Sequence, residues 1–213
     1  MTKRLGRPPK YSDEEVLARA VELFWAQGFR GTSVRDIEQA LDLRPGSLYA
    51  RFGSKEGLFV RALEVYAERM GQDIAAVLEN APDPVTGIGR YCRMLAQAIA
   101  SRDAAVVRPA CMIVRTLLEF AGEEDAIGVR AAELLEDVEA RLAAAIARAQ
   151  AAGQLSRSIP PRRLARLCQL QIMGLRVLAQ RPLSSRGITQ TADDVLRLLE
   201  QLAANPAPVR KAS

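Results

Sequence analysis

The chain contains no histidine and only three cysteines among its 213 residues. Without histidine it cannot form a Ser-His or Cys-His catalytic pair, and it has no imidazole ligand for a metal ion. It also lacks a Cys-x-x-Cys pair, a glycine-rich phosphate loop and a dinucleotide-binding fingerprint. These absences argue against an enzyme, and we expect no catalytic residue, no metal site and no cofactor.

Long apolar runs are missing as well. No stretch approaches the roughly 20 apolar residues that a membrane helix needs, and no apolar segment follows the basic N-terminus as it would in a signal peptide. Three widely spaced cysteines do not form the disulfide framework of a secreted protein. We therefore expect a cytoplasmic protein without a membrane partner.

Aromatic residues make up only 5% of the chain, and no alternating β-branched run predicts a strand. Hydrophobic residues nevertheless reach 49%, which is enough to bury a core. Alanine and leucine recur through long glycine-poor stretches, and both favour helices. The composition predicts an all-α fold, and the apolar periodicity divides it into about nine helices.

The segment 32–59 has the pattern of a helix-turn-helix. Ser33 is a candidate N-cap, and Val34, Ile37 and Leu41 then share one face at helical spacing. Asp42 stands at the turn, and Asp is one of the few residues that tolerate a positive φ. The alternative is two ordinary surface helices of an all-α protein.

Pro45 follows at a position suited to the first residue of a second short helix. Leu48 and Phe52 would face the core of the head, which leaves a polar, basic and aromatic outer face. We expect Gly46 to let the backbone approach DNA closely, and Thr32 and Lys55 to contact phosphates. The side chains expected to face DNA are Arg35, Arg44, Ser47, Tyr49 and Arg51.

A basic arm precedes the first helix. Lys3, Arg4, Arg7 and Lys10 occur with no acidic residue among them, in a chain of net charge +5. We expect this arm to be disordered in solution and to lie along phosphates or in the minor groove when DNA is bound. A merely solubilising tail is the alternative interpretation.

Taken together, these motifs resemble the TetR/AcrR family of transcriptional regulators. The chain departs from the usual pattern at Glu38, Asp42, Arg44 and 50–51, so Arg44 and Arg51 are expected to reach bases that the usual residues do not. The matching segments are Arg7–Lys10, Ala20–Phe24, Gly28–Phe29, Gly31–Ser33, Val34–Ile37, Gly46–Tyr49, Phe52 and Ser54–Phe59.

The remaining helices are expected at about 54–79, 85–100, 110–121, 126–152, 162–180 and 191–204, after a first helix capped by Ser12 and ended by Gly28. The acidic turn 122–125 is interpreted as the start of a helix and not as a metal site. The predicted domains are a helix-turn-helix head with its arm (1–55), an effector-binding and dimerisation domain (56–205) and a disordered tail (206–213).

The last two helices carry more apolar surface than one subunit needs, which predicts a homodimer packed as a four-helix bundle. The alternative is that this surface belongs to the core of one subunit. A dimer would place two recognition helices on a near-palindromic double-stranded operator.

The head is too small to hold a ligand pocket, so any effector should bind between the helices from about 56 to 180. The resemblance implies that a small molecule there moves the fourth helix, spreads the two heads and releases the operator. The expected lining residues are mostly apolar, with a few polar groups: Tyr66, Tyr91, Met94, Cys111, Met112, Arg115, Phe120, Gln169 and Met173.

Three alternatives to an effector-released repressor stay open. Cys111 lies between Arg108 and Arg115 at a predicted helix start, where a thiol becomes reactive toward oxidants and electrophiles, so the regulator could sense redox state. Cys92 and Cys168 are expected in the core. A helical interaction protein without DNA function would explain 71–213 but not 1–59, and an architectural DNA binder would leave the C-terminal domain without a role.

Overall fold

The computed structural model describes residues 11–101, 111–181 and 184–204, and all regular secondary structure in these ranges is helical. The all-α prediction is therefore confirmed. None of the described helices is long and apolar enough to cross a membrane. The helices are α1 (Asp13–Gln27), α2 (Val34–Ala40), α3 (Ser47–Phe52), α4 (Lys55–Glu79), α5 (Pro84–Ala100), α6 (Met112–Glu119), α7 (Ala126–Ala151), α8 (Pro161–Leu178) and α9 (Ser185–Ala203).

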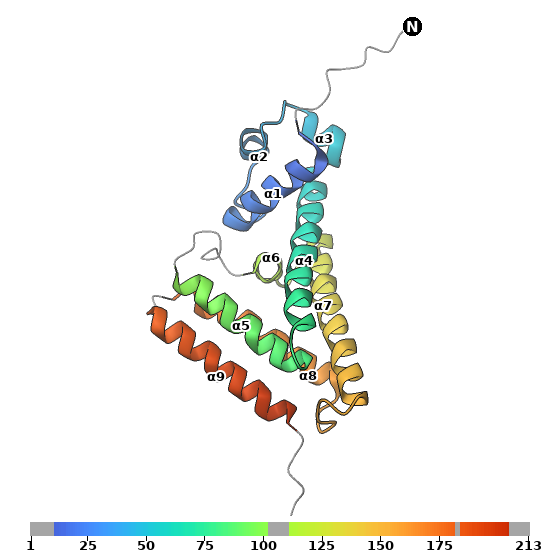
Figure 1. Ribbon diagram of the computed structural model, residues 1–213. Coiled ribbons are helices and arrows are strands. Elements are labelled where there is room, and N and C mark those ends of the chain that lie inside the picture. The colour runs from blue at the N-terminus through green and yellow to red at the C-terminus, as the bar shows by residue number, and fades with distance from the viewer. Residues whose placement is uncertain (1–10, 102–110, 182–183, 205–213) are drawn as a thin grey trace, which may run out of the picture.

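Helices α1, α2 and α3 form a small head at one end of the molecule (Figure 1). Ile37, Leu41 and Leu48 are fully buried in it. The ring of Phe24 meets that of Phe59 from α4 edge to face, with 4.8 Å between centroids. Because the start of α4 supplies part of the core of the head, a movement of α4 is transmitted directly to the head.

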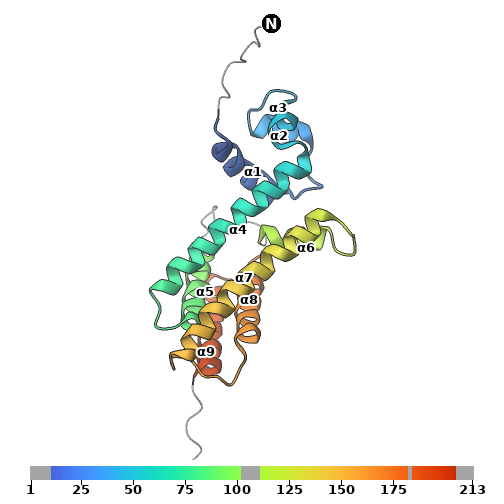
Figure 2. The same ribbon diagram turned by 90° about the vertical axis from the view of Figure 1, so that its right-hand side faces the viewer.

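Helix α4 then leads from the head into a larger body formed by α5 to α9 (Figure 2). In the body α5 lies along α9 and α7 lies along α8. The approach of α5 to α9 is close: a Cβ added at Gly89 would lie 2.1 Å from Leu196 Cδ1 and 3.1 Å from its Cα. Only glycine allows this packing at position 89.

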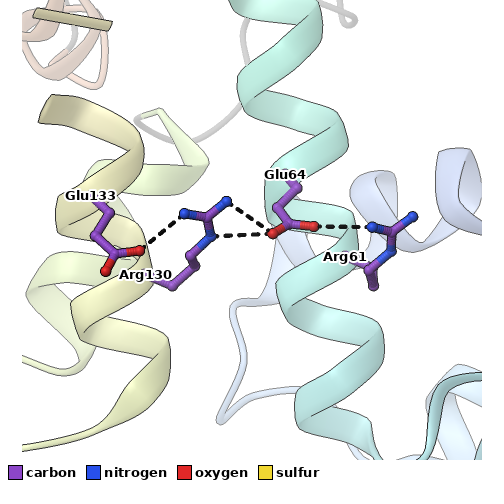
Figure 3. A network of polar contacts seen from close by, with 4 residues as sticks. All are labelled: Arg61, Glu64, Arg130 and Glu133. Carbon is purple, nitrogen blue, oxygen red and sulfur yellow. Dashed lines mark hydrogen bonds and ion pairs between the residues drawn. The ribbon is translucent and has the colours of Figure 1, made fainter. Parts of the chain in front are cut away.

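An ion-pair network fixes α7 against α4 (Figure 3). Nε and Nη2 of Arg130 donate to one oxygen of Glu64 at 3.1 and 3.0 Å, and Nη1 donates to Glu133 at 2.9 Å. The other oxygen of Glu64 accepts from Arg61 at 3.3 Å. Partly exposed pairs contribute only about 0–1 kcal/mol each, so this network sets the register of α7 on α4 more than it adds stability.

Two helix starts differ from the sequence prediction. Helix α9 begins at Ser185 and not near 191, because the Ser184 side chain accepts from the Gly187 N–H and Ile188 is buried. Helix α3 begins at Ser47, so Pro45 lies in the preceding turn and not at the first helical position. The residues of the predicted N-terminal arm and of the tail 206–213 lie outside the described residues.

Candidate nucleic-acid interface and ligand cavity

The helix-turn-helix forms as its local sequence predicts. Ser33 Oγ accepts from the Asp36 N–H at 3.2 Å, and Asp36 accepts from the Ser33 N–H at 2.8 Å, which together make a capping box. Asp42 adopts φ +52°, the only positive φ at a non-glycine position among the described residues. The turn between α2 and α3 is therefore closed by the residue that was expected to close it.

The start of α3 is set by Gly46, the N-cap residue, at φ +80°. Nothing lies within 4 Å of a Cβ placed there, so the left-handed backbone and not crowding favours glycine. Because helical geometry cannot include this residue, the helix starts one position later than Gly46. Leu48 is fully buried and Phe52 packs against the core, as predicted.

Several predicted DNA-facing side chains are accessible. Arg35, Arg44 and Gly46 are exposed, Tyr49 is 54% exposed and Ser47 is half-buried. No ion pair to Arg35 or Arg44 occurs in the described part of the chain. A guanidinium that is not already paired can bind a phosphate or a base edge without first losing a partner.

Thr32 has a different role from the predicted phosphate contact. Its side chain is fully buried, and Oγ1 donates to the Gly28 carbonyl at 2.7 Å. That carbonyl belongs to the C-cap residue of α1, so the hydroxyl stabilises the end of a helix. A buried, engaged hydroxyl is not available to a DNA phosphate, and the prediction for Thr32 is wrong in this structure.

Arg51 also departs from the prediction, because it does not lie free on the outer face. Its Nε donates to Asp13 Oδ1 at 2.9 Å, and Nη2 reaches the Tyr11 carbonyl at 3.4 Å. The side chain is only 15% exposed. Arg51 ties α3 to the start of α1, so its guanidinium is not free to contact a base.

Lys55, the first residue of α4, is half-buried. Its Nζ lies 4.1 Å from the centroid of the Phe29 ring, a cation–π contact. The contact orients the ammonium group but leaves its N–H donors available to an oxygen ligand.

The head is joined to the body by α6. Arg115 Nη1 donates to the carbonyls of Trp25 and Ala26 at 3.0 and 2.9 Å, at the C-terminal end of α1. Glu119 accepts from the backbone N–H groups of Phe29 and Arg30 at 3.1 and 2.5 Å. A cation at a helix C-terminus and a carboxylate on free N–H groups are both favourable placements. We call Arg115 and Glu119 the α6 junction.

The α6 junction corrects two further predictions. Arg115 was expected to line a ligand pocket, but its guanidinium holds the end of α1. Phe120 lies buried at the same junction, with 5.6 Å between its ring centroid and that of Phe29. Both residues connect head and body, because the residues following α1 fold back onto α6.

Two cavities lie in the region where an effector site was predicted. The first, of about 420 Å³, lies between α1, α4, α5 and α8, and we call it the aromatic cavity. Tyr66, Tyr91 and Met94 line it, as predicted, together with Trp25, Met70 and Arg176. The second, of about 650 Å³, lies between α4, α5, α7 and α8. We call it the aliphatic cavity, and Gln169 is the predicted residue that lines it.

The remaining predicted residues line neither cavity. Cys111 and Met112 are buried, and Met173 is half-buried against the core. Sequence reasoning missed Trp25 and Arg176. A signal for Arg176 was present, because it is the only charged residue within the apolar stretch 170–178.

The polar side chains that line the aromatic cavity are the phenols of Tyr66 and Tyr91, the guanidinium of Arg176, and Glu22, Arg69 and Asp73. Arg176 Nη2 donates to Tyr91 Oη at 3.3 Å. Burial raises the pKa of both phenols, that of Tyr66 to well above its ordinary value. Both hydroxyls therefore keep their protons at neutral pH and can act as donors.

The three cysteines fall into two groups. Burial raises the pKa of the Cys92 and Cys168 thiols to about 12, which makes them the inert core residues that were expected. Cys111 is the N-cap residue of α6, as predicted, and is 3% exposed. Of its two neighbouring arginines, Arg115 is engaged with α1 and Arg108 lies outside the described residues.

The acidic turn 122–125 starts a helix as predicted, with Asp125 accepting from the Ile127 N–H at 2.7 Å.

Comparison with known proteins agrees with this geometry. Residues 16–62 match the family model of the bacterial regulatory proteins of the tetR family, and residues 87–190 match the model of the tetracyclin repressor-like C-terminal domain. The HTH-type transcriptional repressor ComR of Escherichia coli K12 is 26% identical over 94% of each chain. BdcR of the same strain, also an HTH-type transcriptional repressor, is 39% identical over 35% of this chain and 38% of its own.

A solved structure extends the comparison to the whole fold. The TetR family regulator CifR, a cysteine mutant in complex with a 26-base-pair double-strand operator DNA, superposes with a TM-score of 0.76. It is 27% identical, and the match covers 90% of this chain and 98% of that one. With both halves of the chain matched by family models, this protein belongs to the TetR family of bacterial transcriptional regulators.

Proposed function

We propose that the protein is a homodimeric repressor that binds a near-palindromic operator and leaves it when a small-molecule effector binds. One observation carries this proposal: the aromatic cavity is lined both by α1 of the DNA-binding head and by helices of the body. A ligand in that position contacts both parts whose relative orientation controls DNA binding. ComR, which is named a repressor, and CifR, which was solved on operator DNA, support the assignment.

The DNA contacts divide into two kinds. Arg35, Arg44, Ser47 and Tyr49 are the side chains we assign to base edges and nearby phosphates, and Gly46 allows close backbone approach. Lys55 is assigned to a phosphate. Base contacts carry sequence preference, whereas phosphate contacts position the head and contribute to affinity on any sequence.

A second copy of the chain would pack against the last two helices. Leu170 and Val177 are 57% and 51% exposed on α8, seven residues apart and so on one side of the helix. Gly174 lies between them with nothing within 4 Å of an added Cβ, which leaves room for a neighbouring helix. Leu198 supplies exposed apolar surface on α9. A symmetric pair would present two heads to half-sites about one helical turn apart.

Release requires that the effector bind the non-binding arrangement more tightly than the DNA-bound one. A hundredfold loss of operator affinity corresponds to roughly 3 kcal/mol of such preference. The α6 junction supplies the rigid connection, because Arg115 and Glu119 hold the end of α1. A ligand that displaces Trp25 therefore shifts the head together with α1.

The proposal is tested by footprinting the full-length protein on the DNA upstream of its own gene and of the adjacent genes. We expect protection of two half-sites on one face of the duplex, and binding that exceeds that to unrelated duplexes of equal length. Equal affinity for unrelated duplexes would reject a sequence-specific regulator. Sedimentation of the protein alone, giving twice the chain mass, tests the dimer.

A further inference from the structure

Two residues that line the aromatic cavity each carry a buried polar atom without a hydrogen-bond partner among the described residues: the hydroxyl of Tyr66 and Nε of Arg176. Tyr66 is 6% exposed. Cys111 and the Met112 backbone are close enough to influence its titration, but neither meets the geometry of a hydrogen bond. Folded proteins pair nearly all such buried groups with protein or ordered water, so two donors without a protein partner beside one cavity are available to a bound ligand.

Of these two donors, the phenol of Tyr66 is neutral and the guanidinium of Arg176 is positively charged. A guanidinium stays protonated under all physiological conditions, and Arg176 forms no ion pair with a carboxylate in the part of the chain described here. Its polar neighbours are Tyr66, Tyr91 and Cys111, all neutral when protonated. Asp73 and Glu22 also line the cavity, but neither is bonded to Arg176. A half-buried guanidinium that is not bonded to a carboxylate favours an anionic ligand.

Most of the remaining lining is apolar or aromatic, and Glu22, Arg69 and Asp73 are its charged residues. The ring of Trp25 meets that of Tyr66 edge to face, with 5.1 Å between centroids, and Met70, Met94 and Leu95 also line the walls. A volume of about 420 Å³ falls in the usual range for small organic ligands. The ligand should therefore carry an apolar body as well as its charge.

We propose that the effector is a small organic acid whose carboxylate accepts hydrogen bonds from Arg176 and Tyr66, with its apolar body against Trp25 and Met94. The role of this acid as an effector rests on the proposed function, whereas the acid-binding site itself does not. The aliphatic cavity is larger but has no buried polar atom without a partner. Occupation of the aromatic cavity acts on the head directly, because Trp25 belongs to α1 and its carbonyl is held by Arg115.

Trp25 is the only tryptophan in the chain, so its fluorescence reports on this cavity alone. The full-length protein is titrated with phenylacetate and with hexanoate, and in parallel with phenylacetamide and hexanamide, which have the same shape but no charge. We expect saturable changes in Trp25 emission with at least one acid, and an affinity about tenfold or more above that of its amide, since charge-assisted bonds are the stronger ones.

Variants locate the site. Arg176→Gln should weaken acid binding about tenfold or more, and Tyr66→Phe should weaken it by a smaller factor, because it removes a neutral donor. Arg148→Gln is the matched control, since Arg148 lines the aliphatic cavity. It should leave acid binding unchanged. Far-ultraviolet circular dichroism checks folding, and the comparison of acid with amide in the parent protein needs no variant.

Three outcomes would overturn the inference: no saturable response to either acid, equal affinity for acid and amide, or an Arg176→Gln protein that is folded and binds acid as the parent does. Operator release is measured separately with the same acids. Acid binding that leaves operator affinity unchanged keeps the anion site and rejects its role as the effector site. Release by another compound, with no acid binding, keeps the regulator and rejects the acid.

Discussion

Two arginines near the recognition helix show how position decides the role of a residue. Arg44 lies exposed in the turn before α3, without an ion pair among the described residues. Arg51, seven positions later, is almost buried and bonded to Asp13. Both have the same donors and the same charge, but only the guanidinium of Arg44 is exposed and without an ion pair among the described residues.

We predict that Arg44→Ala weakens binding to the specific operator by about 1–3 kcal/mol, the range for loss of a bidentate base contact. The free energy of unfolding should stay within about 0.5 kcal/mol of that of the parent, as for most exposed substitutions. Arg51→Ala should instead lower the free energy of unfolding by about 1 kcal/mol through loss of its ion pair, and leave operator affinity close to that of the parent. Operator binding by fluorescence anisotropy and urea unfolding of each variant provide the comparison; a folded Arg44→Ala protein with parental operator affinity would contradict this assignment.

Lys55→Ala should weaken binding to specific and unrelated duplexes by the same factor. The reason is that a phosphate contact carries no sequence preference, and its loss lowers the slope of log affinity against log salt by about 1. Titrations at several salt concentrations measure that slope. A loss confined to the specific operator would instead place Lys55 on a base.

At the scale of the helices, α6 is short but connects the two parts of the molecule. Its Glu119 accepts from two backbone N–H groups that directly follow α1. Gly28, between α1 and this contact, has φ +79°, and a Cβ there would lie 2.9 Å from Glu119 Oε2. The absence of a side chain at Gly28 leaves room for the Glu119 carboxylate at the end of α1.

We predict that Glu119→Gln loosens the head without unfolding the body. A neutral amide oxygen accepts more weakly than a carboxylate, and charged hydrogen bonds contribute about 1.5–3 kcal/mol. Amide hydrogen exchange should accelerate at Phe29 and Arg30 and stay unchanged in α7 and α8. Glu124→Gln, exposed in the loop after α6, is the control. Equal protection in parent and Glu119→Gln would show that the junction does not restrain the head.

Helices α7 and α8 carry a pH-dependent contact. Glu139 on α7 accepts from Arg166 at 2.9 Å and from Arg162 at 3.0 Å on α8, and the hydrogen bond from Arg166 is the largest cause that lowers its pKa. The depressed native pKa means that this stabilisation is complete above the unfolded glutamate pKa, about 4.3. It is lost as the pH falls through the native value.

Glu139→Gln should therefore flatten the acid limb of stability against pH below about 4.3, where the unfolded-state carboxyl takes up its proton. Urea unfolding between neutral and acidic pH measures this. Arg162→Gln and Arg166→Gln should each reproduce part of the effect. An unchanged acid limb in Glu139→Gln would mean that these ion pairs contribute nothing to folding.

For the whole molecule, the exposed apolar residues of α8 and α9 mark the surface assigned to the second copy. A charge placed there would have to be buried at the interface without a partner. Val129 is also apolar and is 56% exposed, but it lies on α7 and not on α8 or α9. It provides a control of the same chemistry at a site outside the proposed interface.

Val177→Glu should convert the dimer to a monomer, whereas Val129→Glu should leave it intact. Analytical ultracentrifugation distinguishes the two, and operator affinity should fall with dissociation because one head contacts only one half-site. A Val177→Glu protein that still sediments as the parent dimer would place the interface elsewhere.

The sequence by itself determined the features that depend on near neighbours. The caps at Ser12 and Ser33, the helix end at Gly28 and the turn at Asp42 all rest on residues three or four positions apart, whose geometry a helix or turn imposes. The apolar periodicity likewise predicted most helices to within a few residues. The spacing of residues along the chain is enough to predict such contacts, and these contacts identify the head and the all-α fold.

Only the tertiary structure decided which distant groups meet. Arg51 meets Asp13 across 38 positions, Arg115 meets the carbonyl of Trp25 across 90, and Arg176 meets Tyr91 across 85. No spacing rule encodes these pairs, because they follow from how long helices cross and which side chains the crossing buries. For that reason the sequence named Tyr66 and Tyr91 as cavity residues, but the packing of α1 and α8 against them brought in Trp25 and Arg176.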